Sequence, residues 1–226
     1  MSGVAAVVLA GGSGTRLGAG RNKVLLDLAG EPLLRHSVRT AASVTDVRVV
    51  VVVVRPGEEP DLSGDWPVPV ETAPGGSTRH GSEWSALTHL RPRVEAGEVD
   101  VVAIHDAARP LASRGLWEAV VDAAREHGGA LPARRAVGLV AREGGAVPDL
   151  VTVQTPQAFR AVPLLEAYAA AERDGFTGTD TAACVSAYPS DPPLRLRAVE
   201  GEATNLKVTW REDLPLAERL LAGLRG

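Results

Sequence analysis

The chain is poor in cysteine, methionine, aromatic residues and lysine. It has one methionine, one cysteine and 4% aromatic residues in 226 positions. A single cysteine excludes an intramolecular disulfide, and Cys184 lies in an apolar stretch where we expect a small core residue rather than a nucleophile. Lysine occurs only at Lys23 and Lys207, against 22 arginines. Because lysine is a compact point charge and arginine a flat fork, these two positions indicate a need for a small cation, with chance as the alternative.

Long hydrophobic runs and an excess of basic charge are also missing. The apolar run at residues 47–54 is too short to cross a bilayer, and the first residues carry no basic segment of the kind that opens a signal peptide. The formal net charge of -4 gives no basic surface for nucleic acid. We therefore expect a cytoplasmic protein that binds neither membrane nor nucleic acid, in which any phosphate ligand is held by a local cluster of cations.

Short apolar segments alternate with longer segments of helical periodicity along the chain. Segments that are apolar on both faces are typical of strands covered on both sides, so the pattern predicts one α/β domain over residues 1–226, with a three-layer, mostly parallel twisted sheet. The expected strands are Val4–Leu9, Val47–Val54, Val68–Thr72, Val99–His105, Ala130–Pro132 and Leu194–Val199, the last at an edge. The expected helices are Pro32–Val44, Ser77–Leu90, Ser113–His127, Pro163–Asp174, Asp180–Ala187 and Arg211–Leu224.

Residues 133–153 interrupt this alternation. They contain Arg134, Arg135, Arg142 and the turn pair Gly144-Gly145, with weak apolar alternation around them. This composition is typical of a β-hairpin outside the main sheet. We interpret the segment as a β-arm.

A glycine-rich loop follows the first expected strand. Gly11, Gly12 and Gly14 let backbone N–H groups approach a polyphosphate, and Arg16 and Lys23 supply positive charge. A dinucleotide fingerprint would need glycine where the chain has leucine at position 17, and a Walker loop would need glycine directly before the lysine and a hydroxyl residue after it. The loop thus predicts a phosphate site of another kind, with a plain glycine-rich turn as the alternative.

The second motif, His105–Pro110, begins where another expected strand ends. In parallel sheets ligands bind beyond the carboxyl ends of the strands, so this motif and the glycine-rich loop are expected at one site. Asp106 can hold a divalent metal or a substrate hydroxyl, and Arg109 can bind a phosphate with its fork. The alternative is that Asp106 caps a helix. His105 ends a buried strand, where we expect a structural hydrogen bond rather than a catalytic base.

Several motifs together resemble one enzyme family. The loop LAGGSGTRLG, followed by NKVLLDLAGEPLL, resembles the opening of nucleotidyltransferases with a nucleotide-diphospho-sugar transferase, Rossmann-like fold. The HDAARP segment is similar to that of 2-C-methyl-D-erythritol 4-phosphate cytidylyltransferases. Four further segments agree with that family in order and approximate spacing: GGSTRHGS from Gly75, TPQAF from Thr155, the pair Thr179-Asp180, and EGEATNLKVT from Glu200.

The resemblance implies transfer of CMP from CTP to a small polyol phosphate, most simply 2-C-methyl-D-erythritol 4-phosphate, with Mg²⁺ as cofactor and a homodimer formed through the arm. It assigns transition-state or catalytic roles to Arg16, Lys23 and Lys207. It assigns nucleotide binding to Leu9, Ala10, Gly11, Gly12, Ser13, Gly14, Gly75, Ser82 and Ala107. It assigns acceptor binding to Asp106, Arg109, Thr155 and Lys207, and metal binding to Asp106.

The chain departs from the family pattern in its acceptor-binding half. The expected Asp, Thr and Lys of the arm are absent, no arginine stands shortly before Thr155, and the acidic residue expected after Asp180 is Thr181. Arg134, Arg135 or Arg142 offers a replacement cation. The alternative acceptors are a different polyol phosphate or a hydroxyalkyl phosphonate, and the alternative donor is another nucleotide. The alternative from another class is a catalytically silent regulator that binds a nucleotide.

Overall fold

The computed structural model describes residues 2–12, 22–139, 144 and 150–225. Its centre is an eight-stranded sheet with the strand order β10-β7-β9-β6-β1-β4-β5, and β8 pairs with β7 off this path. The strands are β1 (Gly3–Leu9), β4 (Val47–Val54), β5 (Val70–Pro74), β6 (Val99–Asp106), β7 (Gly128–Arg135), β8 (Val151–Val153), β9 (Gln157–Arg160) and β10 (Arg195–Glu200). A separate two-stranded hairpin joins β2 (Asp27–Leu28) to β3 (Glu31–Pro32).

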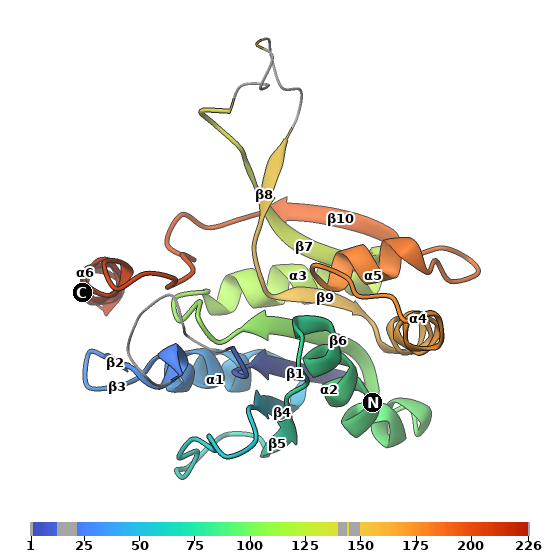
Figure 1. Ribbon diagram of the computed structural model, residues 1–226, viewed down its shortest axis with the longest axis horizontal. Helices are drawn as coiled ribbons and strands as arrows, with labels where there is room; N and C mark the ends of the chain where they lie inside the picture. Colours follow the sequence, from blue (N-terminus) through green and yellow to red (C-terminus); the bar gives the residue numbers. More distant parts are fainter. Residues whose placement is uncertain (1, 13–21, 140–143, 145–149, 226) are drawn as a thin grey trace.

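Helices cover both faces of the sheet and give the three expected layers (Figure 1). The helices are α1 (Leu33–Ser43), α2 (Arg79–Glu95), α3 (Arg114–His127), α4 (Ala161–Asp174), α5 (Thr181–Ala187) and α6 (Asp213–Arg225), with a 3₁₀ turn, η2, at Lys23–Leu25. Buried residues of α1 and α3 pack on one face of the sheet, and those of α2, α4 and α5 pack on the other. No helix within the described ranges is long and apolar enough to cross a membrane.

The central strands are parallel, as their two apolar faces predict. β1 pairs in parallel with β4 on one side and with β6 on the other, and the valine-rich β4 and the core of β6 are almost completely buried. β9 is the exception, since it lies antiparallel between β6 and β7. The carboxyl ends of β1 and β6 are paired at Leu9 and Asp106, which brings the two main motifs to the same edge.

Several expected boundaries were wrong. Helix α2 begins at Arg79, with Thr78 as its N-cap, and runs five residues beyond the expected end. Strand β7 is longer than expected, and β9 and the β2–β3 hairpin were not expected at all. Asp106 does not cap a helix, because α3 begins at Arg114 and Ser113 caps it through its side chain.

The segment interpreted as an arm projects from the body of the molecule (Figure 1). At its base, β7 and β8 pair antiparallel, with Ala133 opposite Val153 and Arg135 opposite Val151. Arg142 and Gly145 lie outside the described residues.

Candidate active site

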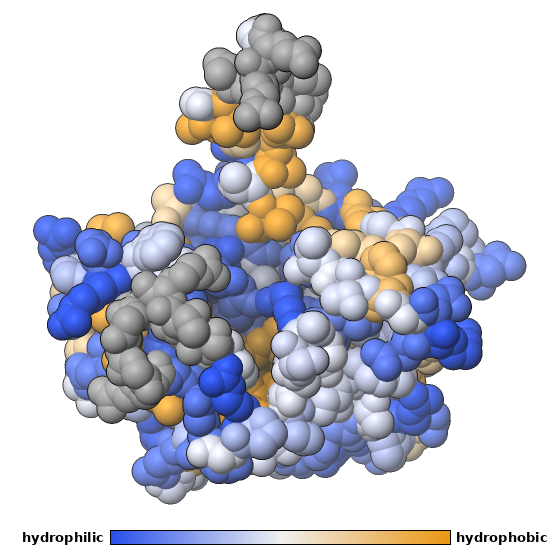
Figure 2. Space-filling model, viewed as in Figure 1, coloured by the Kyte–Doolittle hydropathy of each residue, from blue (hydrophilic) through white to orange (hydrophobic). Residues whose placement is uncertain are grey.

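A cavity of about 630 Å³ opens at the carboxyl ends of β1, β4 and β6. Figure 2 shows the hollowed face of the molecule below the projecting arm. The lining residues come from the end of β1 and the glycine-rich loop, from η2, from the residues after β4, from the turn before α2 and its first residues, from the end of β6 and from the segment before α6. They are Leu9, Gly11, Gly12, Lys23, Val24, Arg55, Pro56, Gly75, Gly76, Ser77, Thr78, Arg79, Ser82, Asp106, Ala108, Lys207 and Thr209. Segments from both ends of the chain thus form one concave site.

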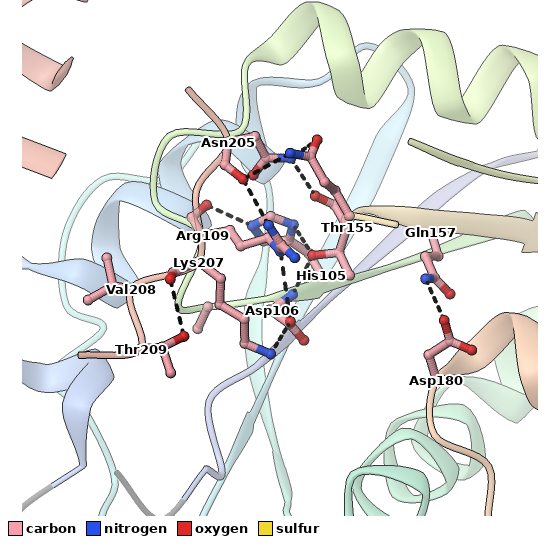
Figure 3. A network of polar contacts seen from close by, with 12 residues as sticks. His105, Asp106, Arg109, Thr155, Gln157, Asp180, Asn205, Lys207, Val208 and Thr209 are labelled. Atoms are coloured by element: carbon pink, nitrogen blue, oxygen red, sulfur yellow. Dashed lines mark hydrogen bonds and ion pairs between the residues drawn. The ribbon is translucent and has the colours of Figure 1, made fainter. Parts of the chain in front are cut away.

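Asp106 lies at the centre of a cluster of cations (Figure 3). Lys207 Nζ is 2.8 Å from Asp106 Oδ2, and Arg79 forms an ion pair with Oδ1. Arg109 is farther away, with Nε 3.9 Å from Oδ2. Burial raises the pKa of the Asp106 carboxyl, but the charges of Arg79 and Lys207 outweigh it and hold that pKa well below its usual range. The carboxylate is therefore ionised and fixed between two cations.

His105 and Thr155 hold the backbone of this strand end. The Asp106 N–H donates to Thr155 Oγ1 at 3.0 Å, and Thr155 Oγ1 lies 3.1 Å from His105 Nδ1. His105 Nε2 lies 3.1 Å from the carbonyl oxygen of Arg109. Because that carbonyl only accepts, Nε2 carries the proton and Nδ1 accepts from the Thr155 hydroxyl. Burial lowers the pKa of His105 to about 4, so the ring is neutral and both nitrogens are engaged in structural hydrogen bonds.

Two of the residues expected at the acceptor do not line the cavity. Thr155 is buried behind Asp106 in the chain of hydrogen bonds just described. Arg109 donates from Nη1 to the carbonyl oxygen of Asn205 at 2.8 Å, and its side chain is 13% exposed. Asn205 in turn donates to the Thr155 carbonyl at 3.0 Å. Arg109 and Thr155 thus tie the segment before Lys207 to the end of β6.

The two lysines of the chain line the same cavity. Lys23 donates from Nζ to the carbonyl oxygen of Val208 at 3.0 Å, next to Lys207. Lys23 is placed by Asn22, whose buried side chain donates to the Ala10 carbonyl at 2.5 Å and accepts from the Val24 N–H. The loop and the C-terminal segment therefore converge through these two cations.

The described residues of the expected nucleotide-binding set lie around the glycine-rich wall. Leu9, Gly11, Gly12, Gly75 and Ser82 line the cavity. Ala10 and Ala107 lie directly beside it in the backbone, where the Ala107 N–H donates to the Leu9 carbonyl. The Ser82 hydroxyl donates to the Thr78 carbonyl and accepts from the Gly76 N–H, which fixes the turn before α2. Ser13, Gly14 and Arg16 lie outside the described residues.

Sequence reasoning missed two cavity cations, Arg79 and Arg55. Arg79 lies within the GGSTR segment that carried the resemblance, so its position in that motif was an available signal. Arg55 follows β4 directly and forms an ion pair with Glu58 at 3.3 Å. Its place at the end of a buried parallel strand was the signal for a residue at this edge.

The donor set for a metal ion is small. Asp106 is the one acidic side chain among the described residues that line the cavity, and those residues hold no group of three or more His, Cys, Asp or Glu that could bind a metal. Mg²⁺ commonly binds through one or two carboxylates plus substrate phosphates and keeps several waters. Asp106 therefore fits an ion that arrives with a polyphosphate, not one held by the protein alone.

Comparison with known proteins places this chain in a family. The family model described as 2-C-methyl-D-erythritol 4-phosphate cytidylyltransferase matches residues 4–223. The enzyme of that name from Symbiobacterium thermophilum is 37% identical over 229 residues, covering 96% of this chain and 92% of the relative. The one from Thermobifida fusca is 37% identical over 236 residues, covering 96% and 93%.

Solved structures agree in fold. The crystal structure of 2-C-methyl-D-erythritol 4-phosphate cytidylyltransferase from Thermus thermophilus superimposes with a TM-score of 0.76 at 33% identity, covering 96% of this chain and 98% of that one. A structure from Anaerococcus prevotii has a TM-score of 0.81 at 23% identity, over 98% and 99% of the chains, which shows the shared fold. The motifs, the cavity and these similarities agree, and the chain belongs to the 2-C-methyl-D-erythritol 4-phosphate cytidylyltransferase family.

Proposed function

We propose that the protein transfers CMP from CTP to the phosphate of 2-C-methyl-D-erythritol 4-phosphate and releases pyrophosphate. The observation that carries this proposal is the convergence of Lys23, Lys207 and Asp106 on one cavity whose wall is the glycine-rich loop. The names of the relatives support the choice of substrates.

The reaction needs positioning and charge neutralisation more than proton transfer. An oxygen of the acceptor phosphate attacks the α-phosphorus in line, the new P–O bond forms, and the bond to the β-phosphate oxygen breaks. A phosphomonoester has a second pKa of about 6, so it is mostly doubly ionised near neutral pH and needs no general base. His105 is consistent with a reaction that needs no base, because its ring is neutral and both ring nitrogens already make hydrogen bonds.

The cations divide naturally between the two substrates. Lys23 lies beside the glycine-rich wall, where it meets the charge that grows on the α-phosphoryl oxygens. Lys207 lies beside Asp106 and meets the acceptor phosphate. Arg16 keeps its expected role on the triphosphate as a prediction from the motif.

Mg²⁺ fits this site as a companion of the triphosphate. The triphosphate oxygens would supply most of its ligands, with Asp106 as the protein carboxylate, and the ion would neutralise phosphate charge when bound. Arg79 and Lys207 each contact one oxygen of that carboxylate and offset its negative charge, although each oxygen keeps a second lone pair for a metal ion. We therefore expect weak Mg²⁺ binding to the free protein and strong binding together with CTP.

The arm supports a homodimer. Val137, Leu139 and Val151 are 82%, 53% and 54% exposed on a segment that projects from the body. Exposed apolar side chains on such a segment are suited to burial against a second copy. We also propose that the protein is cytoplasmic.

A substrate matrix tests the reaction. Pyrophosphate release and product mass are measured with CTP, UTP, GTP and ATP against 2-C-methyl-D-erythritol 4-phosphate, other polyol phosphates and hydroxyalkyl phosphonates. We expect the highest kcat/KM for CTP with 2-C-methyl-D-erythritol 4-phosphate. Since the arm lacks the expected acceptor residues, preference for another acceptor is the second candidate, and tight CTP binding with no turnover on any acceptor would identify a silent regulator.

A further inference from the structure

Glu83 is a buried carboxylate behind the cavity wall that the reaction described above does not use. It lies on α2, one turn after Arg79, and is 1% exposed. The Tyr168 hydroxyl from α4 donates to Oε2 at 2.5 Å, and the Thr181 hydroxyl from α5 donates to Oε1 at 2.8 Å. Arg79 Nη2 lies 3.2 Å from Oε1 in an ion pair.

Three polar groups thus surround the Glu83 carboxylate inside the protein. A buried carboxylate is costly unless charges and hydrogen bonds compensate it. Burial is the largest effect and leaves the pKa of Glu83 above its usual value, although Arg79, Tyr168 and Thr181 oppose it. Burial and the charge of Glu83 also keep the pKa of Tyr168 well above its usual value, so its hydroxyl remains a donor.

Arg79 connects this buried carboxylate to the cavity. Its Nη1 forms the ion pair with Asp106 Oδ1, and its Nη2 forms the ion pair with Glu83. One guanidinium therefore bridges two carboxylates, of which Asp106 lines the cavity and Glu83 does not. The contact with Asp106 is a hydrogen bond, whereas Nη2 makes no hydrogen bond and is attracted to Glu83 as an ion pair. The two carboxylates therefore restrain the planar guanidinium from two sides, on the Glu83 side by charge alone.

We propose that Glu83 is a positioning residue, which fixes Arg79 and through it the Asp106 carboxylate that faces Lys207. This inference rests on the proposed function for its kinetic consequence. Without Glu83, the Arg79 guanidinium is held on one side only, and the spacing of Asp106 and Lys207 at the acceptor is no longer fixed. Misplacement by about 1 Å at a reacting centre can cost about a hundredfold in rate.

The sequence departure at Thr181 supports the same inference. The resembling motif has an acidic residue at this position, whereas here the Thr181 hydroxyl contacts a carboxylate supplied by α2. The negative charge is therefore present at this place but comes from a different helix. Exchanging the two residues should return the carboxylate to the same region from α5.

The test compares Glu83→Thr with the exchange variant Glu83→Thr/Thr181→Glu. We expect Glu83→Thr to lower kcat about tenfold to hundredfold, with the KM and Kd for CTP changed less than threefold. The exchange variant should recover kcat to within about threefold of the wild type. Leu87→Val, one turn farther along α2 and in the buried cluster that contains Tyr168, is the matched control for lost core packing and should lower Tm without changing kcat.

Wild-type kcat in folded Glu83→Thr would overturn the inference, as would an exchange variant that folds and binds CTP but stays as slow as the single variant. If Glu83→Thr does not fold, the near-isosteric Glu83→Gln replaces it, with the same expected loss of kcat. A double-mutant cycle with Arg79→Lys adds a second criterion. Because Glu83 acts through Arg79, its loss should cost little more once Arg79 is replaced, and additive losses would contradict this.

A measurement without turnover separates this inference from the proposed function. Rotation of the Arg79 guanidinium is followed by side-chain ¹⁵N NMR in the substrate-free protein, with Arg79→Lys to assign the signal. We expect slow rotation in the wild type and the exchange variant, and fast rotation in Glu83→Thr. If the wild type transfers no nucleotide but this pattern holds, only the proposed function fails. If rotation is equally fast in the wild type, the positioning role of Glu83 fails.

Discussion

Lys23 and Val208 are joined by a hydrogen bond of 3.0 Å although 185 positions separate them in the chain. The contact ties the turn after the glycine-rich loop to the segment that carries Lys207. Since Lys23 and Lys207 both line the cavity, this hydrogen bond helps to fix the position of one cation relative to the other.

We predict that Lys23→Ala lowers kcat by about two or more orders of magnitude, in the range expected when one preorganised donor to a transition state is lost. Lys23→Arg should not restore the rate, because a flat guanidinium cannot replace the ammonium at both the Val208 carbonyl and the phosphate. Steady-state kinetics and CTP titration calorimetry measure the effect. Arg219→Ala, an exposed cation of α6, is the control. Turnover near the wild-type value in Lys23→Ala would remove Lys23 from the chemistry.

We predict that Lys207→Met raises the KM for 2-C-methyl-D-erythritol 4-phosphate at least tenfold and changes the KM for CTP less than threefold. The variant removes the cation that lies 2.8 Å from Asp106 and leaves the glycine-rich wall intact. Initial rates with each substrate varied in turn give the two constants. Arg211→Met, an exposed cation nearby in the chain, should match the wild type. Equal changes in both constants would contradict a role at the acceptor alone.

The turn before α2 allows a steric prediction. A Cβ on Gly76 would lie 2.6 Å from the backbone carbon of Gly81, closer than real Cβ contacts allow. Gly76→Ala must therefore move the first turn of α2, and we expect a lower Tm and at least tenfold weaker CTP binding. Gly115→Ala in the first turn of α3 is the control, because its Cβ meets only an ordinary van der Waals contact. Unchanged CTP affinity in Gly76→Ala would show that this turn does not contribute to nucleotide binding.

The valine-rich central strands were predictable, since apolar residues on both faces identify buried parallel strands. The convergence of Asp106 with Gly11 and Gly12 followed from the rule that parallel strands present their carboxyl ends at one edge. β9 was not predicted because it is only four residues long and overlaps the TPQAF segment, which was interpreted as a family motif and not as a strand.

The direction in which a side chain points was harder to predict from the sequence than the place of its residue in the fold. The role of Thr155 and Arg109 at the acceptor stays a prediction, and the sequence did not reveal their hydrogen bonds to His105, Asp106 and Asn205. Residues 105–109, Thr155 and Asn205 lie in three segments that are distant in the chain, so the geometry of these contacts depends on tertiary packing. The bridge from Asp106 through Arg79 to Glu83 was missed for the same reason.

Cys184 should be unreactive in the folded protein. It is fully buried, and burial raises the pKa of its thiol to about 12. At pH 8 the thiolate fraction is then roughly a thousandfold or more below that of a free cysteine, whose pKa is about 8.5. Ellman's reagent should react slowly with the native protein and at the ordinary rate in guanidinium chloride, with Cys184→Ser as the blank. Fast reaction of the native protein would contradict the assignment of Cys184 to the core.

The arm gives a prediction about assembly. If it forms the dimer interface, Val151→Asp places a charge where apolar side chains are removed from water, so the dimer should dissociate to monomers. Sedimentation equilibrium distinguishes the 23.5 kDa chain from twice that mass. Val162→Asp is a closely matched control, because Val162 on α4 is 52% exposed and Val151 is 54% exposed, but only Val151 belongs to the arm. A wild-type monomer, or a dimer that survives Val151→Asp, would place any assembly elsewhere. Loss of acceptor turnover in the monomer with CTP affinity retained would further indicate that the partner's arm completes the acceptor site, where this chain lacks the residues its family pattern expects.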